Sequence, residues 1–165
     1  MREISNFTTK DMGMVSNRSE SDFPLSQPES TPDETSFAGL VGKRVIIVED
    51  EGVTQMQLRR TLRSAGLEVI GSATNAEDGV ALVLEQRPEI VLMDIRMPGK
   101  YDGLEGARRI LAEYSVCILM LTAFSDESYR QKAQDAHVSG YVLKPVTAEI
   151  LLPQIANAMR NFGNN

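Results

Sequence analysis

Polar side chains stand at the ends of four apolar runs in this sequence. Each run has the length of a strand, and the polar residues that end the runs are, in chain order, Glu49 with Asp50, Asp94, Thr122 and Lys144. If the runs are buried parallel strands, their carboxyl ends lie along one edge of the sheet, which is where ligands bind in open α/β sheets. The pattern therefore predicts a site that combines three carboxylates, a hydroxyl and an ammonium group.

The three acids of this predicted site require a counter-charge. Two carboxylates about 4 Å apart repel each other by roughly 4 kcal/mol at an effective dielectric constant of about 20, and a third carboxylate adds to the cost. Oxygen ligands in a small, open site suit Mg²⁺, which keeps several of its waters and also binds phosphate oxygens. We therefore expect Glu49, Asp50 and Asp94 to bind Mg²⁺.

Lys144 and Asp94 supply two further requirements of phosphoryl chemistry. The lysine ammonium is a point charge that pairs with a phosphate oxygen, or with Asp94 when no phosphate is bound. A carboxylate beside Mg²⁺ and a lysine is a competent nucleophile toward phosphorus, and the product is an acyl phosphate. In such a transfer the metal and the lysine stabilise charge on the moving group while the protein mainly positions it. The residue types thus predict phosphorylation of Asp94.

Strands and helices alternate along the chain from Lys43 onward. The predicted strands are residues 45–48, 68–73, 90–94, 116–122 and 141–144, and the predicted helices are residues 52–65, 76–86, 104–113, 126–136 and 147–161. Alternation with short connections implies right-handed crossovers and a parallel sheet with helices on both faces. We therefore expect an α/β fold whose sheet edge positions the polar residues.

The composition restricts the function classes. The chain has 165 residues, 42% of them hydrophobic, which suits one compact domain and is short for two. Its net charge is −6 and Lys and Arg form no cluster, so the positive footprint of a nucleic-acid-binding protein is missing. The apolar runs are far shorter than the roughly 20 residues that span a bilayer, and no signal-peptide pattern is present. With its single cysteine, Cys117, the sequence predicts a cytoplasmic protein that binds neither nucleic acid nor membrane.

Residues 1–40 differ in composition from the rest of the chain. They are dominated by Ser, Thr, Pro, Asn, Asp and Glu. Such a segment buries too little apolar surface to offset the entropy lost on ordering it. We therefore predict a disordered N-terminal tail over residues 1–40 and a folded domain over residues 41–165.

Four motifs at the predicted strand ends resemble those of the receiver domains of two-component response regulators. The motifs are Val48-Glu49-Asp50-Glu51, Met93-Asp94-Ile95-Arg96-Met97-Pro98-Gly99, Leu121-Thr122-Ala123 and Tyr141-Val142-Leu143-Lys144-Pro145, in that order. The resemblance extends from Lys43 to about Arg160. It implies a flavodoxin-like open sheet of five parallel strands in the order 2-1-3-4-5, with helices on both faces.

The resemblance also implies the roles of the acidic residues. Asp94 is then the phosphoacceptor, and Glu49 and Asp50 are the acidic pair that binds Mg²⁺. The backbone carbonyl of Arg96 completes the protein ligands of the metal. One departure concerns the interval from Asp94 to Gly103, which is one residue longer than in the commonest pattern of the family.

The remaining motif residues are implied to form the catalytic complement and the switch. Thr122 and Lys144 would contact the phosphoryl group, and Tyr141 would change its rotamer when Thr122 moves inward. Pro145 matches the position of a cis peptide bond in the family. His137 stands where the fourth helix is expected to end, and histidine tolerates positive φ better than most residues.

The sequence therefore predicts a single-domain response regulator, because only about twenty residues follow Lys144 and suffice for one helix. We expect a sensor histidine kinase or a histidine phosphotransfer protein to donate the phosphoryl group, and phosphorylation to alter binding of a downstream partner. The chain would not be an enzyme beyond its own Mg²⁺-dependent phosphorylation and dephosphorylation. Two alternatives remain open: a phosphoryl shuttle or sink within a multistep relay, and a binding module that works without phosphorylation.

Overall fold

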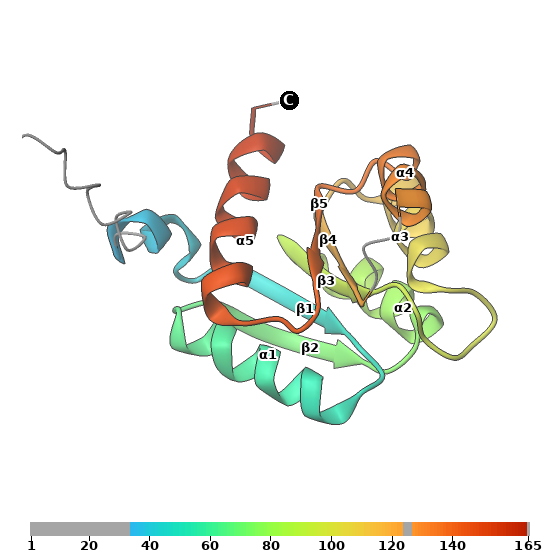
Figure 1. Cartoon of the computed structure of the whole chain (residues 1–165), viewed down its shortest axis with the longest axis horizontal. Coiled ribbons are helices and arrows are strands. Elements are labelled where there is room, and N and C mark those ends of the chain that lie inside the picture. Colours follow the sequence, from blue (N-terminus) through green and yellow to red (C-terminus); the bar gives the residue numbers. More distant parts are fainter. Residues whose placement is uncertain (1–33, 124–126, 165) are drawn as a thin grey trace, which may run out of the picture. The chain divides into compact units, whose positions relative to one another are not determined.

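Five parallel strands form one sheet in the order β2-β1-β3-β4-β5 in the computed structural model, which describes residues 34–123 and 127–164 (Figure 1). The strands are β1 (Arg44–Val48), β2 (Glu68–Ala73), β3 (Ile90–Asp94), β4 (Cys117–Thr122) and β5 (Gly140–Leu143). The helices are η2 (Glu34–Leu40, a 3₁₀ helix), α1 (Gly52–Ser64), α2 (Ala76–Gln86), α3 (Gly103–Glu113), α4 (Glu127–Asp135) and α5 (Ala148–Phe162). The predicted α/β fold and strand order are confirmed.

Helices cover both faces of the sheet, and each face has its own core. Leu92 of β3 packs with residues of α1 and α5, including Leu62 and Ile155. The next residue along β3, Met93, belongs to the opposite core, together with Ile110 of α3. Figure 1 shows the same division, with α1 and α5 on one side of the sheet and α2 and α3 on the other. A continuous apolar run therefore fills two cores, as expected for a buried parallel strand.

Local sequence signals fix the ends of several helices. The Asn75 side chain accepts a hydrogen bond from the Asp78 amide at the start of α2, and Asp102 does the same for Glu105 at the start of α3. His137, two residues beyond α4, has φ 58°, as predicted. These caps set where the helices begin and end, and so the lengths of the loops that carry the polar residues.

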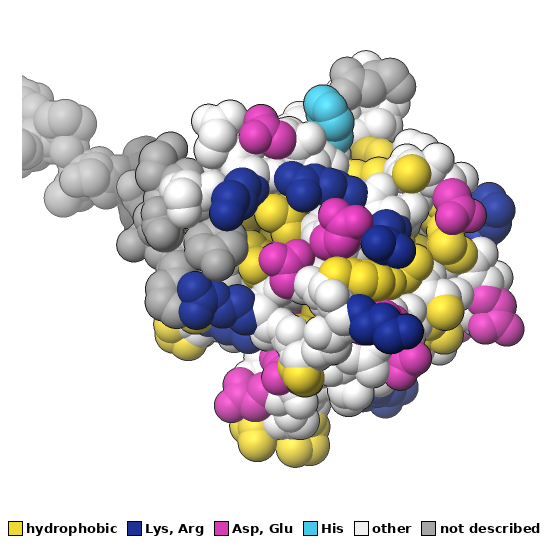
Figure 2. Space-filling view, turned by 90° about the vertical axis from the view of Figure 1, so that its right-hand side faces the viewer, with side chains coloured by type: hydrophobic (Ala, Val, Ile, Leu, Met, Phe, Trp, Pro, Cys, Tyr) yellow, Lys and Arg dark blue, Asp and Glu magenta, His cyan; other side chains and the backbone are white. Residues whose placement is uncertain are grey.

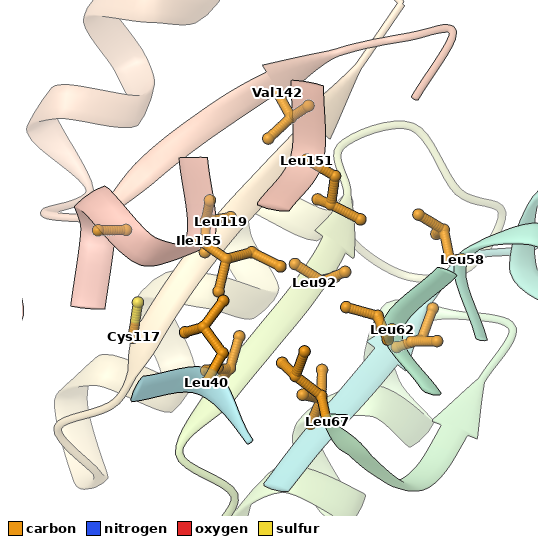
Figure 3. Close-up of a cluster of buried hydrophobic side chains, with 14 of the residues drawn as sticks. Leu40, Leu58, Leu62, Leu67, Leu92, Cys117, Leu119, Val142, Leu151 and Ile155 are labelled. Carbon is orange, nitrogen blue, oxygen red and sulfur yellow. The ribbon is translucent and has the colours of Figure 1, made fainter. Parts of the chain in front are cut away.

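The predicted boundary between tail and domain is wrong by several residues. Residues 34–40 form the 3₁₀ helix η2, and Leu40 is buried in the core. Figure 3 shows its side chain among those of Leu67, Cys117 and Ile155, and Phe37 packs against the same core. The run Phe37-Ala38-Gly39-Leu40 is too short to show a helical period, and the polar stretch before it dominates the composition, which is why it was assigned to the tail. The rest of the predicted tail, residues 1–33, lies outside the described residues.

The surface carries charges of both signs. Figure 2, which views the side of the molecule that bears α3 and α4, shows acidic and basic side chains interspersed with apolar ones. Within residues 34–123 and 127–164, every helix is too short or too polar to cross a membrane.

Candidate functional site

The register between β1 and β3 brings the acidic residues together. Val48 pairs with Met93, so the residues that follow them, Glu49 and Asp94, leave the two central strands at the same level. Oxygen atoms of Glu49, Asp50 and Asp94 all lie within 4.8 Å of one another. The predicted cluster of three carboxylates is thus present at the carboxyl edge of the sheet.

The register of the next two strands adds Thr122 and Lys144 to the same edge. Asp94 pairs with Leu121 of β4, and Thr122 pairs with Leu143 of β5. The amide of Lys144 donates a hydrogen bond of 2.7 Å to the carbonyl of Thr122. The hydroxyl and the ammonium group predicted for this edge therefore lie at the ends of the two strands beyond Asp94, in the order β3-β4-β5.

Lys144 bridges two of the acids. Its Nζ lies 2.8 Å from Oε2 of Glu49 and 3.0 Å from Oδ2 of Asp94. The side chain of Glu49 is 0% exposed, that of Asp94 8% and that of Lys144 20%. The predicted pairing of Lys144 with Asp94 in the absence of phosphate is confirmed, and the additional pairing with Glu49 holds the lysine over the centre of the cluster.

Burial and charge act in opposite directions on these groups. Burial is the largest influence on Glu49 and raises the pKa of its carboxyl, although Lys144 and the Glu51 amide favour the ionised form. Burial by itself would lower the pKa of Lys144, but the two carboxylates outweigh it and leave that pKa above its ordinary value. The lysine is therefore held as a cation, whereas burial disfavours the ionised form of Glu49.

The donor set fits a divalent cation. Three carboxylates meet within 4.8 Å, one of them fully buried, and the single ammonium group of Lys144 compensates only part of their charge. Oxygen-only ligands of this kind suit Mg²⁺. A buried carboxylate with a raised pKa gains from any additional cation at the site, because the cation favours its charged form.

The loop after β1 is tied down around Glu49. The amide of Glu51 donates a hydrogen bond of 3.0 Å to Oε1 of Glu49. Nε2 of Gln55, in the first turn of α1, donates to the carbonyls of Glu49 at 3.1 Å and Ala73 at 3.3 Å, which joins the ends of β1 and β2. This role of Gln55 was not predictable from the sequence, because a glutamine near a helix start gives no sign of the strands that it will contact.

The loop after β3 begins directly at Asp94. The amide of Arg96 donates to Oδ1 of Asp94 at 3.3 Å. Further along, the amide of Gly103 donates a hydrogen bond of 2.8 Å to the carbonyl of Ile95. A Cβ atom at Gly103 would overlap the carbonyl oxygen of Asp94, so the absence of a side chain lets α3 start against the backbone of Asp94. The Arg96 carbonyl stays a predicted metal ligand.

The two predicted switch residues lie one strand apart. Thr122 is buried at the end of β4, and Tyr141, in β5, pairs with Met120. The guanidinium of Arg130, from α4, lies 5.3 Å from the centre of the Tyr141 ring. Their roles as a switch stay predictions, and Arg130 is a contact that the sequence analysis missed. The peptide bond between Lys144 and Pro145 is cis, as the resemblance implied.

Comparison with known proteins agrees with this geometry. The sequence model of the family described as "response regulator receiver domain" matches residues 45–156. The chain belongs to this family, whose members are the receiver modules of response regulators. This membership is consistent with two-component signalling.

Two curated relatives are themselves regulators. The chain is 35% identical over 128 residues to the transcriptional regulatory protein PdtaR of Mycobacterium tuberculosis, a match that covers 78% of this chain and 62% of that protein. It is 36% identical over 121 residues to the transcriptional regulatory protein DesR of Bacillus subtilis, covering 73% of this chain and 58% of that protein. The chain thus matches about three fifths of the length of these relatives.

Solved structures show the same fold. The signal receiver domain of a modulated diguanylate cyclase from Desulfovibrio desulfuricans superposes with a TM-score of 0.69 at 34% identity, covering 74% of this chain and 98% of that one. A LuxR-family response regulator from Aurantimonas superposes with a TM-score of 0.67 at 30% identity, covering 73% and 86%.

Proposed function

We propose that this protein accepts a phosphoryl group on Asp94 and thereby switches its binding to a downstream partner. The observation that carries the proposal is Lys144, which lies between Asp94 and Glu49 at 3.0 and 2.8 Å in a cluster of three carboxylates. A plain salt bridge would not need two further acids at this edge, whereas phosphoryl transfer needs a nucleophile, a cation site and a phosphate-binding ammonium group.

The transfer itself requires little covalent chemistry from the chain. A carboxylate oxygen of Asp94 forms a bond to phosphorus while the bond from phosphorus to the donor breaks, and the donor leaves with that electron pair. The amide of Arg96 and the ammonium of Lys144 already contact the two carboxylate oxygens. They therefore hold the carboxylate in place, and Lys144 then pairs with the new phosphoryl oxygens.

A magnesium ion at this site would be held by the carboxylates of Glu49, Asp50 and Asp94 and by the backbone carbonyl of Arg96. When bound, it would neutralise negative charge on the phosphoryl group. We propose a sensor histidine kinase or a histidine phosphotransfer protein as the donor, because the acceptor chemistry suits a phosphohistidine. We further propose that Thr122 and Tyr141 relay the change to the surface of α4, β5 and α5, where a partner protein binds.

Intact mass spectrometry tests the proposal. Acetyl phosphate with Mg²⁺ should add one phosphate that is labile in base, and Asp94→Asn should remove it. Asp135→Asn, at the exposed end of α4, is the matched control and should be labelled like the wild type. Equal labelling of Asp94→Asn and the wild type would exclude Asp94 as the acceptor.

A further inference from the structure

One carboxylate from α2 holds the loop that follows the acceptor strand. This loop comprises residues 95–102 between β3 and α3. Glu77, in the first turn of α2, accepts a hydrogen bond through Oε1 from the backbone amide of Lys100. Its other oxygen, Oε2, is buried without a hydrogen-bond partner among the described residues. The partly exposed carboxylate therefore faces the loop through both of its oxygens.

Gly99 fits the loop to this carboxylate. Its φ is 136°, a backbone conformation that residues other than glycine rarely adopt. A Cβ atom built on Gly99 would lie 2.5 Å from Oε2 of Glu77, well inside van der Waals contact. The loop thus reaches Glu77 because it has a glycine there, in the same interval that is one residue longer than the commonest receiver pattern.

Both ends of the loop are anchored near the phosphorylation site. At its start the amide of Arg96 donates to Oδ1 of Asp94 at 3.3 Å. At its end the guanidinium of Arg109 lies 4.3 Å from the centre of the Tyr101 ring, and Asp102 caps α3. Glu77 holds the segment between these anchors.

We propose that Glu77 is a positioning residue for the phosphoacceptor site. By binding the Lys100 amide it fixes the path of the loop, and the loop in turn holds the Arg96 amide against Asp94. Without this contact the loop samples positions in which the Arg96 amide leaves the acceptor carboxylate. Its effect on an acyl phosphate rests on the proposed function: a loosened loop admits water to the phosphorylated Asp94 and shortens its lifetime.

Three variants separate this role from a general effect on α2. Glu77→Ala removes the acceptor of the Lys100 hydrogen bond, whereas Glu77→Gln keeps an acceptor oxygen without the charge. Asp78→Ala is the matched control, because it removes the other first-turn acid of α2, whose side chain bonds to Asn75 and not to the loop. It therefore reproduces any loss of favourable interaction with the helix dipole.

Amide exchange of Lys100, a Mg²⁺ titration and the half-life of the phosphorylated protein give three readouts. In Glu77→Ala, exchange of the Lys100 amide should rise roughly ten-fold, because a hydrogen bond to a charged acceptor shifts a local equilibrium by about that factor. Mg²⁺ should bind about three-fold more weakly or worse, and the phosphoryl half-life should shorten by a similar factor. Glu77→Gln should lie between Glu77→Ala and the wild type, and Asp78→Ala should match the wild type.

Each alternative outcome overturns a defined part of the proposal. Lys100 exchange in Glu77→Ala within about two-fold of the wild type would show that the contact does not hold the loop. Faster exchange with unchanged Mg²⁺ affinity and half-life would show that the loop does not position Asp94. If the wild type takes no phosphate, the proposed function fails, but Lys100 exchange and the Mg²⁺ titration still decide the role of Glu77. If Glu77→Ala does not fold, Gly99→Ala replaces it, since its Cβ would displace the carboxylate from Lys100.

Discussion

Replacing Lys144 with methionine should destabilise the metal-free protein far more than the loss of an ordinary ion pair would. Lys144 lies 2.8 Å from a Glu49 oxygen and 3.0 Å from an Asp94 oxygen, and the two acids are 0% and 8% exposed. At an effective dielectric constant of about 20, each attraction is roughly 6 kcal/mol before desolvation costs are subtracted. Methionine keeps most of the apolar stem, so the variant isolates the loss of charge.

The net effect follows from the two acids left behind. Removing one partner of a buried pair typically costs about 3–5 kcal/mol, because the remaining charge is buried without compensation. Glu49 has a raised pKa and relieves part of this cost by taking up a proton. We therefore expect Lys144→Met to lower the free energy of unfolding by about 3 kcal/mol and the melting temperature by about 10 °C.

Denaturant and thermal unfolding with EDTA or with millimolar Mg²⁺ measure this effect. Mg²⁺ should restore more stability to Lys144→Met than to the wild type, because it replaces the missing positive charge. Lys43→Met is the control: Lys43 pairs with Glu89 at 2.7 Å, but the side chains are 34% and 40% exposed, so its loss should cost at most about 1 kcal/mol. The reasoning is refuted if the two variants lose equal stability, or if Mg²⁺ stabilises Lys144→Met and the wild type equally.

Three other outcomes follow from the structure. Folding raises the pKa of Glu49, so at pH values just above its ordinary pKa of 4.5 the folded protein binds more protons than the unfolded chain. Without metal, the free energy of unfolding should therefore increase as the pH falls through that range. Glu49→Gln should flatten this slope in denaturation measured at several pH values. Leu40→Ala should lower the free energy of unfolding by about 2–3 kcal/mol in the same assay. Deletion of residues 1–33 should leave the melting temperature within a degree or so of that of the full chain. Equal stability of Leu40→Ala and the wild type would show that η2 does not contribute to the core. Thr122→Ala should still accept phosphate, but adding beryllofluoride, a mimic of the phosphoryl group, should not change its amide exchange around Tyr141. The same change in this variant as in the wild type would exclude the proposed switch.

Most of the fold was predictable because buried parallel strands and amphipathic helices leave distinct periodic signals. The predicted second strand and second helix, residues 68–73 and 76–86, have the same bounds in the structure. The strand order was not predictable from these periodic signals. Apolar runs do not say which strands pair, and the order came from the resemblance to receiver domains.

The site was predictable where a polar residue ends a strand or follows it directly, because strand ends of a parallel sheet meet at one edge. Asp94 and Lys144 are examples. Contacts that join helices to loops were not predictable in the same way. Glu77 reads in the sequence as an ordinary acid in a first helical turn, and its bond to the Lys100 amide depends on how α2 and the loop after β3 pack in three dimensions. Leu40 was missed because the apolar run around it is too short to show a period.

The described side chains of α4 are mostly exposed, which implies that this helix opens more readily than the buried sheet. Ala133 is the buried side chain among those that the structure describes on α4, and it packs with Ala136 and with Leu104 of α3 in a small cluster of its own. Alanine methyl groups contribute only about 0.8 kcal/mol each when buried. Opening of α4 should therefore require less free energy than unfolding of the sheet, whose central strands are fully buried. A partner that selects one placement of α4 therefore has only a small local free-energy cost to overcome.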